Sequence, residues 1–427
     1  MARRVVITGL GVVSPLGVGA DRHWAGLASG RSAVARLDRL TRLGFPVDVA
    51  AEISPPDFAA CASRLPRKQM KLYNRATTLA MAAAALAAED AGLAVPVPDP
   101  ARAGVILATL FIPYPIQSIL KLVPDVETVE GNRADLGKTL ARCFTDVNPL
   151  DLSLRIIPNL TAGHLAIHFG LRGACRTVAD GPTGGLHALA HAAAAIRDGA
   201  LDVAFCGGAE CPLEDLVFAD LCCTELLAPP AELPDRTCRP FGAGRRGTAV
   251  GEGAAVLVLE AEEHAARRGA GVRAECGGFG AASGDATADG IRDSLGLAMR
   301  TALDGSGLAS PDAVSLHGDG GAGSDLGEAA AFRALDRRAG ARPAAYATKG
   351  AHGNLFSAAG PVEVVGAVMA LEAGAVPPSR NCEEVDPACG LALDARGVRT
   401  VPRMRTVLVN AVGTYGEAAS LAIARAG

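Results

Sequence analysis

Short runs of β-branched and other apolar residues alternate with longer, alanine-rich segments along most of the chain. Val105–Ala108, Thr177–Ala179 and Ala255–Leu259 are examples of the short runs, and Asn74–Asp90 is an example of the long segments. Strands that alternate with helices of this length form a sheet covered by helices. The chain has 51 Gly and 4% aromatic residues, so small aliphatic side chains have to fill its core. The pattern predicts an α/β protein.

The order of these segments predicts two halves that follow the same logic. We assign residues 1–250 to the first half and 251–427 to the second. No Ser/Pro-rich or charged linker separates them, so we expect one integrated unit. The less regular stretch 110–165 is predicted to be an excursion from the core, and long insertions of this kind carry an interface or a pocket.

Glycines mark the expected ends of several elements. The strand Val5–Thr8 is expected to end at Gly9 and Gly11, and the helix over Asn74–Asp90 is expected to end at Gly92, because glycine accepts the left-handed conformation that follows a helix. The last strand is expected at Thr406–Asn410.

Charge and cysteine content exclude several classes of protein. The chain has 41 basic and 45 acidic residues, a net charge of -4, so no nucleic-acid partner is expected. Its 11 Cys have no CxxC pair and no clustered His, so no metal or cofactor is expected, and an odd count indicates reduced thiols and a cytoplasmic location. Gly and Pro interrupt the apolar runs well short of the ~18 residues of a membrane span, so no membrane association is expected.

The turn at 180–185 lies between a predicted strand and a predicted helix. A nucleophile in such a turn gains from the helix N-terminus, whose dipole and free N–H groups stabilise a thiolate and a developing oxyanion. Pro182 supplies neither a nucleophile nor an N–H group. Proline is also a preferred first residue of a helix, so the turn by itself favours a structural role for Pro182.

Seven separated segments resemble, in the same order, motifs of the β-ketoacyl synthase family. The family has the thiolase fold, so the resemblance implies two similar halves, each with a mixed β-sheet between helices, in a layered αβαβα architecture. The segments are RRVVITGLGVVSPLGVGADRHWAGLASGRSAV, IIPNLTAGHLAIHFGLRG, TVADGPTGGLHALAHAAAAIRDGALDVAFCGGAE, RPFGAGRRGTAVGEGAAVLVLE, VSLHGDGG, ATKGAHGNLFSAAGPVE and VNAVGTYGEAASL.

The catalytic positions that the resemblance implies are only partly retained. The family's nucleophilic Cys falls on Pro182, its first catalytic His on His317, its Lys on Lys349, and its second His on Asn354. His352 lies two positions before Asn354 and is not expected to replace the missing imidazole.

The turn that in the family helps to form the oxyanion hole and gates the acyl pocket also differs. The family's GFGG is replaced by Gly413, Thr414, Tyr415 and Gly416, so Thr414 and Tyr415 become the candidate gate residues. Claisen condensation in the family needs a Cys thioester, oxyanion donors and His residues that stabilise the enolate. Pro182 removes the thiol and one backbone donor, and Asn354 cannot change its charge near neutral pH as His does. The sequence predicts a protein that does not condense.

Among degenerate ketosynthases, the chain resembles a chain length factor, the β subunit of type II polyketide synthases. The resemblance implies a heterodimer with an active ketosynthase, an acyl carrier protein as a further partner, and a role in shaping the cavity for the growing chain. Chain length factors commonly carry Gln at the Cys position, so Pro182 departs from their pattern. Two alternatives stay open: an acyltransferase, decarboxylase or cyclase that uses His317, and a carrier-protein scaffold without catalysis.

Aromatic residues are rare in this chain, so those in the excursion are candidate pocket residues. We expect Phe111 and Tyr114, with Phe144, to face the partner's acyl tunnel and set its depth, and ordinary packing is the alternative. His187 and His191 lie four residues apart on one helical face, but without a third ligand we interpret them as core or interface residues. We interpret Cys175, Cys206 and Cys211 as residues that pack in strands.

Overall fold

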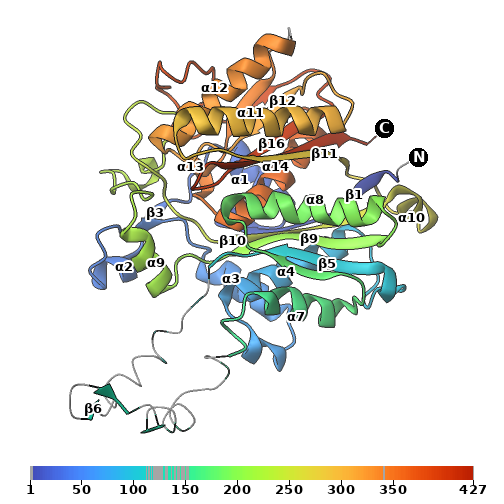
Figure 1. Ribbon diagram of the computed structural model, residues 1–427, viewed down its shortest axis with the longest axis vertical. Helices are drawn as coiled ribbons and strands as arrows, with labels where there is room; N and C mark the ends of the chain where they lie inside the picture. The colour runs from blue at the N-terminus through green and yellow to red at the C-terminus, as the bar shows by residue number, and fades with distance from the viewer. Residues whose placement is uncertain are drawn as a thin grey trace.

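The computed structural model describes residues 3–111, 153–339 and 342–426, together with isolated residues between 113 and 150. Figure 1 shows helices and strands in alternating layers, with helices on both outer faces and helices between the two halves of one continuous main sheet. This is the αβαβα layering that the sequence predicts. From the upper to the lower layer, the helices are α11 (Ala288–Gly305) with α12 (Ala322–Ala339), then α8 (Gly184–Arg197) with α14 (Ala359–Ala373), then α4 (Arg75–Asp90) with α7 (Asn159–Phe169).

Each half contributes five strands that follow one pairing pattern. Across the sheet, two antiparallel pairings are followed by two parallel ones in both halves. In this order the strands of the first half are β1 (Val5–Ser14), β10 (Gly253–Ala261), β9 (Val203–Glu210), β5 (Ala103–Ala108) and β8 (Cys175–Val178). Those of the second half are β11 (Ala274–Ser283), β17 (Glu417–Arg425), β16 (Thr406–Val412), β12 (Ala313–Leu316) and β13 (Ala344–Ala347).

The two halves join where β1 pairs with β11. Strand β10 lies after residue 250, but it pairs with β1 and β9 and completes the first five-strand unit. In the sheet, the first five-strand unit therefore ends with β10 and the second begins with β11, so the boundary lies after residue 261 and not at residue 250. Short or peripheral elements connect the layers: β2 (Gly17–Val18), α1 (Ala20–Ala28), β3 (Ala35–Arg36), α2 (Asp38–Arg42), β4 (Val49–Ala50), α3 (Pro55–Ser63), β6 (Thr128–Val129), β7 (Arg133–Ala134), α9 (Asp215–Cys222), α10 (Glu262–Arg267), α13 (Lys349–His352), β14 (Ala375–Val376) and β15 (Arg399–Thr400).

Strand β1 continues through Gly9 and Gly11, so the prediction that these glycines end it is wrong. A Cβ atom on Gly9 would overlap the carbonyl oxygen of Ala87, and one on Gly11 would overlap that of Ala83. Both carbonyls belong to α4, which lies directly against the strand. The glycines therefore serve close packing between a helix and a strand. Gly92 does follow α4 with φ +58°, as predicted.

The central helices explain why the chain is rich in Gly and Ala. Residues 359–371 of α14 are buried throughout, because sheets cover the helix on both sides. Where α8 crosses α14, a Cβ on Gly185 would overlap Pro361, and one on Gly360 would press against Leu186. Helices that pack between two layers of strands need small residues where they cross, because the side chains at the crossing are buried and cannot turn toward solvent.

Strand β17 is missing from the predicted elements, which end at Thr406–Asn410. It pairs with β16 on one side and β11 on the other, so it is a central strand, and residues 418–423 are buried. A strand buried on both faces loses the alternation of polar and apolar residues that marks a half-exposed strand. Its many alanines add no β propensity, so no sequence signal was left.

The predicted excursion 110–165 overlaps α7, which packs on α4, β5 and β8 as part of the lower layer. The helical stretch Phe356–Ala373 has the length and hydropathy of a membrane span, but 89% of it is buried inside the fold, as in a core helix of a globular protein.

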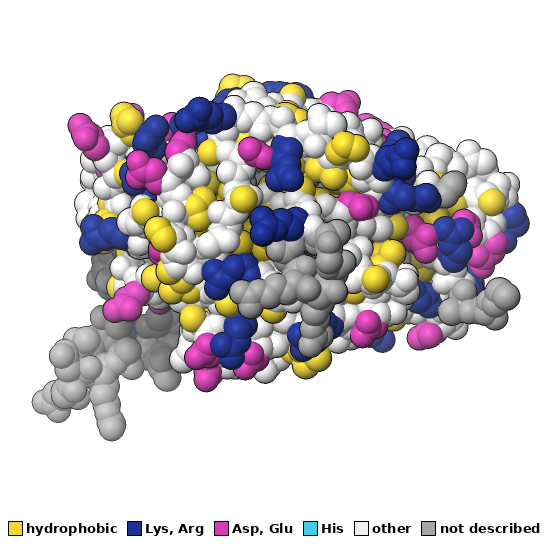
Figure 2. Space-filling view, turned by 90° about the horizontal axis from the view of Figure 1, so that it is seen from above, with side chains coloured by type: hydrophobic (Ala, Val, Ile, Leu, Met, Phe, Trp, Pro, Cys, Tyr) yellow, Lys and Arg dark blue, Asp and Glu magenta, His cyan; other side chains and the backbone are white. Residues whose placement is uncertain are grey.

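On the upper face seen in Figure 2, basic and acidic side chains are interspersed among the residues described there.

Candidate functional site

Pro182 lies in a 3-10 turn, Gly181–Thr183, between the end of β8 and the start of α8. The predicted strand–turn–helix is therefore present, and its helix N-terminus points at this turn. Gly181 has φ +55°, a backbone conformation that favours glycine. The hydroxyl of Ser357 donates to the Gly181 carbonyl over 3.1 Å and ties the turn to the segment that carries Asn354.

Two cavities meet at Pro182. The first cavity has a volume of about 540 Å³ and extends past Asp319 and Asn354. The second cavity has a volume of about 570 Å³ and extends past Phe111 and Tyr415. The residues that line both are Pro182, Thr224, Leu226, Phe356 and Thr414. The ring of Pro182 therefore occupies the junction where a nucleophile would have access to both cavities.

His317 and Lys349 are in direct contact. The Lys349 amine donates to the His317 carbonyl over 2.6 Å and lies 3.2 Å from its Nδ1. The same amine forms an ion pair of 2.7 Å with Glu363, and both side chains of this pair are fully buried. Burial raises the pKa of Glu363, and the Lys349 charge opposes that rise.

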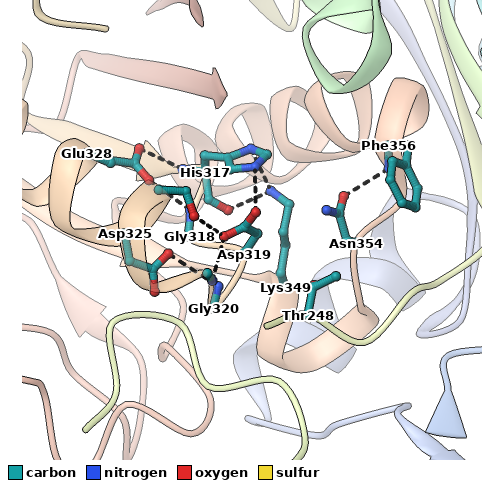
Figure 3. Close-up of polar contacts among 12 residues, drawn as sticks. Thr248, His317, Gly318, Asp319, Gly320, Asp325, Glu328, Lys349, Asn354 and Phe356 are labelled. Carbon is teal, nitrogen blue, oxygen red and sulfur yellow. Dashed lines mark hydrogen bonds and ion pairs between the residues drawn. The ribbon is translucent and has the colours of Figure 1, made fainter. Parts of the chain in front are cut away.

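Asp319 holds the other side of the His317 ring. Its carboxylate lies 3.8 Å from Nε2, and Figure 3 shows this carboxylate and the Lys349 amine both directed at His317. Because the Lys349 amine is a donor at Nδ1, Nε2 carries the proton and faces Asp319. Burial opposes ionisation of Asp319, but the nearby His317 ring and the hydrogen bonds from Ser324 and Gly321 keep the pKa of this carboxyl well below its usual value. His317 is 2% exposed, and among the described residues Asp319 lines the first cavity while His317 does not.

Carboxylates that the sequence analysis did not single out hold this loop in place. Glu328 accepts from the backbone N–H groups of His317 and Gly318, each over 2.8 Å. Asp325 accepts from Gly320 N over 3.2 Å and lies 3.4 Å from an Arg245 nitrogen. Both belong to α12 at a spacing of three residues, directly after the HGDGG segment. That spacing was the available signal, because side chains three apart share one helix face.

Asn354 is buried and lines the first cavity, but on the other side of Lys349 from His317 (Figure 3). Its side-chain oxygen accepts from Phe356 N over 3.0 Å, and its backbone pairs with Ala249 and Gly251. The amide therefore supports the bend into Phe356, whose φ is +47°. His352 is not a substitute imidazole: both ring nitrogens bond within its own turn, and burial lowers its pKa to about 3.

The candidate gate lies at the second cavity. Thr414 and Tyr415 both line it, and residue Tyr415 is 81% exposed. The Glu417 carboxylate accepts from Tyr415 N over 3.0 Å and covers Gly413, where a Cβ would overlap it. The carboxylate therefore occupies the inside of this turn and leaves the Tyr415 ring at the mouth.

Phe111 stands on the wall of the second cavity and packs edge-on against Phe356, with ring centroids 4.9 Å apart. Its backbone N–H donates to the buried Glu210 over 3.1 Å, and that of Leu110 donates over 2.9 Å. Glu210 therefore fixes the start of the excursion against β9. Tyr114 and Phe144, the other predicted pocket residues, lie outside the described residues.

Glu210 is expected to make the protein less stable as pH rises from about 5 to about 8. Glutamate in an unfolded chain titrates near pH ~4.3, whereas burial raises the pKa of Glu210 to about 7. Between these values the folded state holds a proton that the unfolded state has released, so the free energy of unfolding falls with rising pH, by up to about 3 kcal/mol. Urea unfolding across this range should show the fall, and Glu210→Gln should flatten it. Equal slopes in the two proteins would contradict the assignment.

Other candidates from the sequence have mixed outcomes. The rings of His187 and His191 lie 6.4 Å apart, and no group of three potential metal ligands occurs among the described residues. Cys206 and Cys211 are buried in or next to β9, as interpreted. The interpretation of Cys175 as a packed residue is wrong for the single chain: it is exposed, because no strand among the described residues pairs with the outer side of β8.

The amino-acid sequence of the chain matches a known protein family over most of its length. Residues 2–265 match the beta-ketoacyl synthase N-terminal domain, and residues 273–383 match the C-terminal domain. The chain belongs to the beta-ketoacyl synthase family. The tetracenomycin polyketide synthase ketoacyl synthase alpha subunit of Streptomyces glaucescens is 32% identical over 99% of this chain and 97% of its own length. Nodulation protein E of Rhizobium leguminosarum bv. trifolii is 35% identical over 92% of each chain.

Solved structures of beta-ketoacyl synthases have the same fold. The ishigamide ketosynthase/chain length factor aligns over 100% of both chains with a TM-score of 0.81 and 29% identity. A beta-ketoacyl synthase from Burkholderia phymatum aligns over 100% of both chains with a TM-score of 0.83 and 29% identity. The thiolase-like fold predicted from the motifs is confirmed, and relatives of this chain include type II polyketide ketosynthases.

Proposed function

We propose that this protein is a non-condensing ketosynthase-like subunit, a chain length factor, that pairs with an active ketosynthase in type II polyketide biosynthesis. The observation that carries the proposal is Pro182 at the junction of the two cavities. The binding space is kept, while the position at the junction of the cavities holds a ring without a nucleophile or an N–H group.

The charge beside His317 supports the same function. Decarboxylation and condensation both develop negative charge on the substrate, which an active site has to stabilise. Here the ionised Asp319 lines the first cavity at the place where His317 would act. His317 itself is 2% exposed and is not among the residues that line this cavity. An anion next to a developing enolate in a poorly solvated site raises the barrier. This argues against the alternative in which His317 is the base of a decarboxylase, acyltransferase or cyclase.

Strand β8 is the last strand of the main sheet among the described residues, and its outer edge supports pairing with a second subunit. The N–H groups of Val105 and Thr109 in and after β5 donate to the carbonyls of Ala174 and Val178, so residues of odd number in β8 direct their backbone groups outward. An exposed strand edge of this kind is a template for pairing with another chain. We propose that the partner ketosynthase adds its own strand here, that an acyl carrier protein delivers the chain to the pair, and that the complex works in the cytoplasm.

Co-expression with the active ketosynthase of the same biosynthetic system tests the proposal. We expect a stable complex of one copy of each chain by size-exclusion chromatography with light scattering, and a loss of full-length product when this subunit is omitted. Thr177→Pro, which removes an outward-facing N–H group of β8, is expected to weaken the complex. A ketosynthase that makes the same product alone would overturn the proposal. Turnover of acylated carrier protein by the isolated subunit would favour an enzyme, and carrier-protein binding without ketosynthase binding would favour a scaffold.

Phe111→Ala is expected to lengthen the product by enlarging the second cavity. Truncation of a partly buried aromatic ring on a cavity wall opens space that an extra extension unit can occupy, and Phe111 contributes both to the wall and to the contact with Phe356. Mass spectrometry of the products of the complex measures the effect, with Phe45→Ala as a control, because Phe45 packs on Phe218 and does not line either cavity. Unchanged product length would assign Phe111 to ordinary packing.

A further inference from the structure

Asp180 and His187 form a hydrogen-bonded pair on the wall of the second cavity. Nδ1 of His187 lies 2.8 Å from a carboxylate oxygen of Asp180, and both residues line the cavity. Asp180 precedes the 3-10 turn that carries Pro182, and His187 lies in the first turn of α8. The pair therefore stands beside the junction of the cavities, on the wall of the cavity that Asp319 does not line.

The bond to Asp180 determines the state of the His187 ring. A carboxylate accepts a hydrogen bond, so in the neutral ring Nδ1 carries the proton and Nε2 has the lone pair. Nε2 has no hydrogen-bond partner among the described residues, and the side chain stays 21% exposed. Among the described residues that line the two cavities, His187 is the one imidazole. It is available to a ligand, whereas His317 is enclosed between Lys349 and Asp319.

A structural role for Asp180 is not supported by its contacts. Aspartate before a helix commonly caps it by accepting from a backbone N–H group. Asp180 occupies the N-cap position of its turn, but its side chain makes no capping bond there. Its carboxylate contacts His187 instead, as in acid–base pairs where a carboxylate orients an imidazole and stabilises the imidazolium that forms.

The rest of the wall indicates what the pair would act on. Leu110, Phe111, Leu221, Leu226 and Phe356 make the cavity largely apolar. A chain that is mostly carbon fits this wall, with its carbonyl groups left for the few polar side chains. If the proposed function holds, the chain is a poly-β-ketone, in which each carbon between two carbonyls carries an acidic C–H bond.

We propose that Asp180 and His187 are an acid–base pair that moves a proton at such a carbon of a chain held in the second cavity. Nε2 of His187 takes the proton, and the C–H electron pair becomes the double bond of the enolate. The imidazolium then returns the proton to the same carbon or to the enolate oxygen, so no further reactant is consumed. His187 is the catalytic residue and Asp180 is a positioning residue. The proposal rests on the proposed function for the identity of the chain.

Exchange of these protons with solvent tests the pair. The protein, alone and in complex with the ketosynthase, is placed in D₂O with acetoacetyl-pantetheine, and loss of the C2 proton signal is followed by NMR. We expect faster exchange than in buffer, a loss of about 100-fold in His187→Ala and a smaller loss in Asp180→Asn. The matched control is His191→Ala, one turn along the same helix face and outside the cavity wall, which should exchange as the unmodified protein does.

Further readouts separate chemistry from stability. The exchange rate should rise with pH through one ionisation that His187→Gln removes and Asp180→Asn shifts, an effect that a purely structural bond would not produce. Unfolding by urea shows whether each variant is folded. The proposal is overturned if exchange is no faster than in buffer, both for the protein alone and for the complex. It is also overturned if folded His187→Ala and His187→Gln exchange the proton as fast as the unmodified protein.

The outcome is independent of the test of the proposed function. If complex formation and product length are normal in His187→Ala but exchange is unaffected, the acid–base pair fails and the subunit role stands. If exchange depends on His187 but no complex forms with the ketosynthase, the subunit role fails and the acid–base pair stands.

Discussion

Pro182→Cys alone is expected to leave the protein without condensing activity. The change restores a thiol and an N–H group at the helix N-terminus, so the introduced side chain should accept an acyl group from a carrier protein. Condensation also needs stabilisation of the enolate, and the site still presents Asp319 and lacks an imidazole at Asn354. Loss of one stabilising donor costs about 10²–10³-fold in rate. The loss at Asn354 therefore remains, and the charge of Asp319 opposes the enolate in addition.

The matched experiment is a series of three variants. Pro182→Ser is the control for the thiol, Pro182→Cys tests the nucleophile, and Pro182→Cys with Asp319→Asn and Asn354→His removes the opposing charge and restores the imidazole. Mass spectrometry measures acylation, and release of CO₂ from malonyl carrier protein measures the second step. We expect acylation in both thiol variants, and CO₂ release at least about 100-fold faster in the triple variant. Condensation by Pro182→Cys alone would show that Asp319 and Asn354 do not block the reaction.

Glu363→Ala is expected to destabilise the protein by about 3–5 kcal/mol, because it leaves the ammonium group of Lys349 buried without its counter-charge. Both members of the pair are fully buried, and the amine holds the loop through the His317 carbonyl. Lys349→Met should cost less, since Glu363 can take up a proton: burial already raises its pKa. Free energies of unfolding in urea give the comparison.

Two controls make this prediction specific. The double change Lys349→Met with Glu363→Leu removes both charges and should be far less harmful than Glu363→Ala. Glu89→Ala breaks the exposed ion pair with Arg64, 2.7 Å long, and should change stability little. Equal effects of Glu363→Ala and Glu89→Ala would mean that the buried pair contributes no more than a surface pair.

The family of this protein was readable from its sequence because the motifs are local. A strand, a turn and a helix that follow one another within 177–199 keep their order in any fold that forms, so the order of residues alone was enough to place Pro182 at a helix N-terminus. The same holds for His317 and Lys349, which the motifs identified and the fold brings within 3.2 Å of each other.

Contacts between distant segments were not readable in this way. Gly9 and Gly11 were predicted to end the strand, because the residues that require them are more than 70 positions away in the sequence. These residues are Ala87 and Ala83 of α4, whose carbonyls lie against the two glycines. Strand β17 gave no alternating pattern because neighbours cover both of its faces. The sequence shows that residue 319 is an aspartate. Its effect on His317 depends on which ring nitrogen lies against the Lys349 amine, and only the structure shows this.

The sequence alone therefore determined the family, the layered α/β fold and the absence of a nucleophile at 182, since each depends on residue identity and local order. The tertiary structure decided that two cavities meet at Pro182, that Asp319 encloses His317, and that Asp180 orients His187 toward the second cavity. These depend on distances of a few ångströms between side chains from different elements, and packing of the whole fold sets such distances.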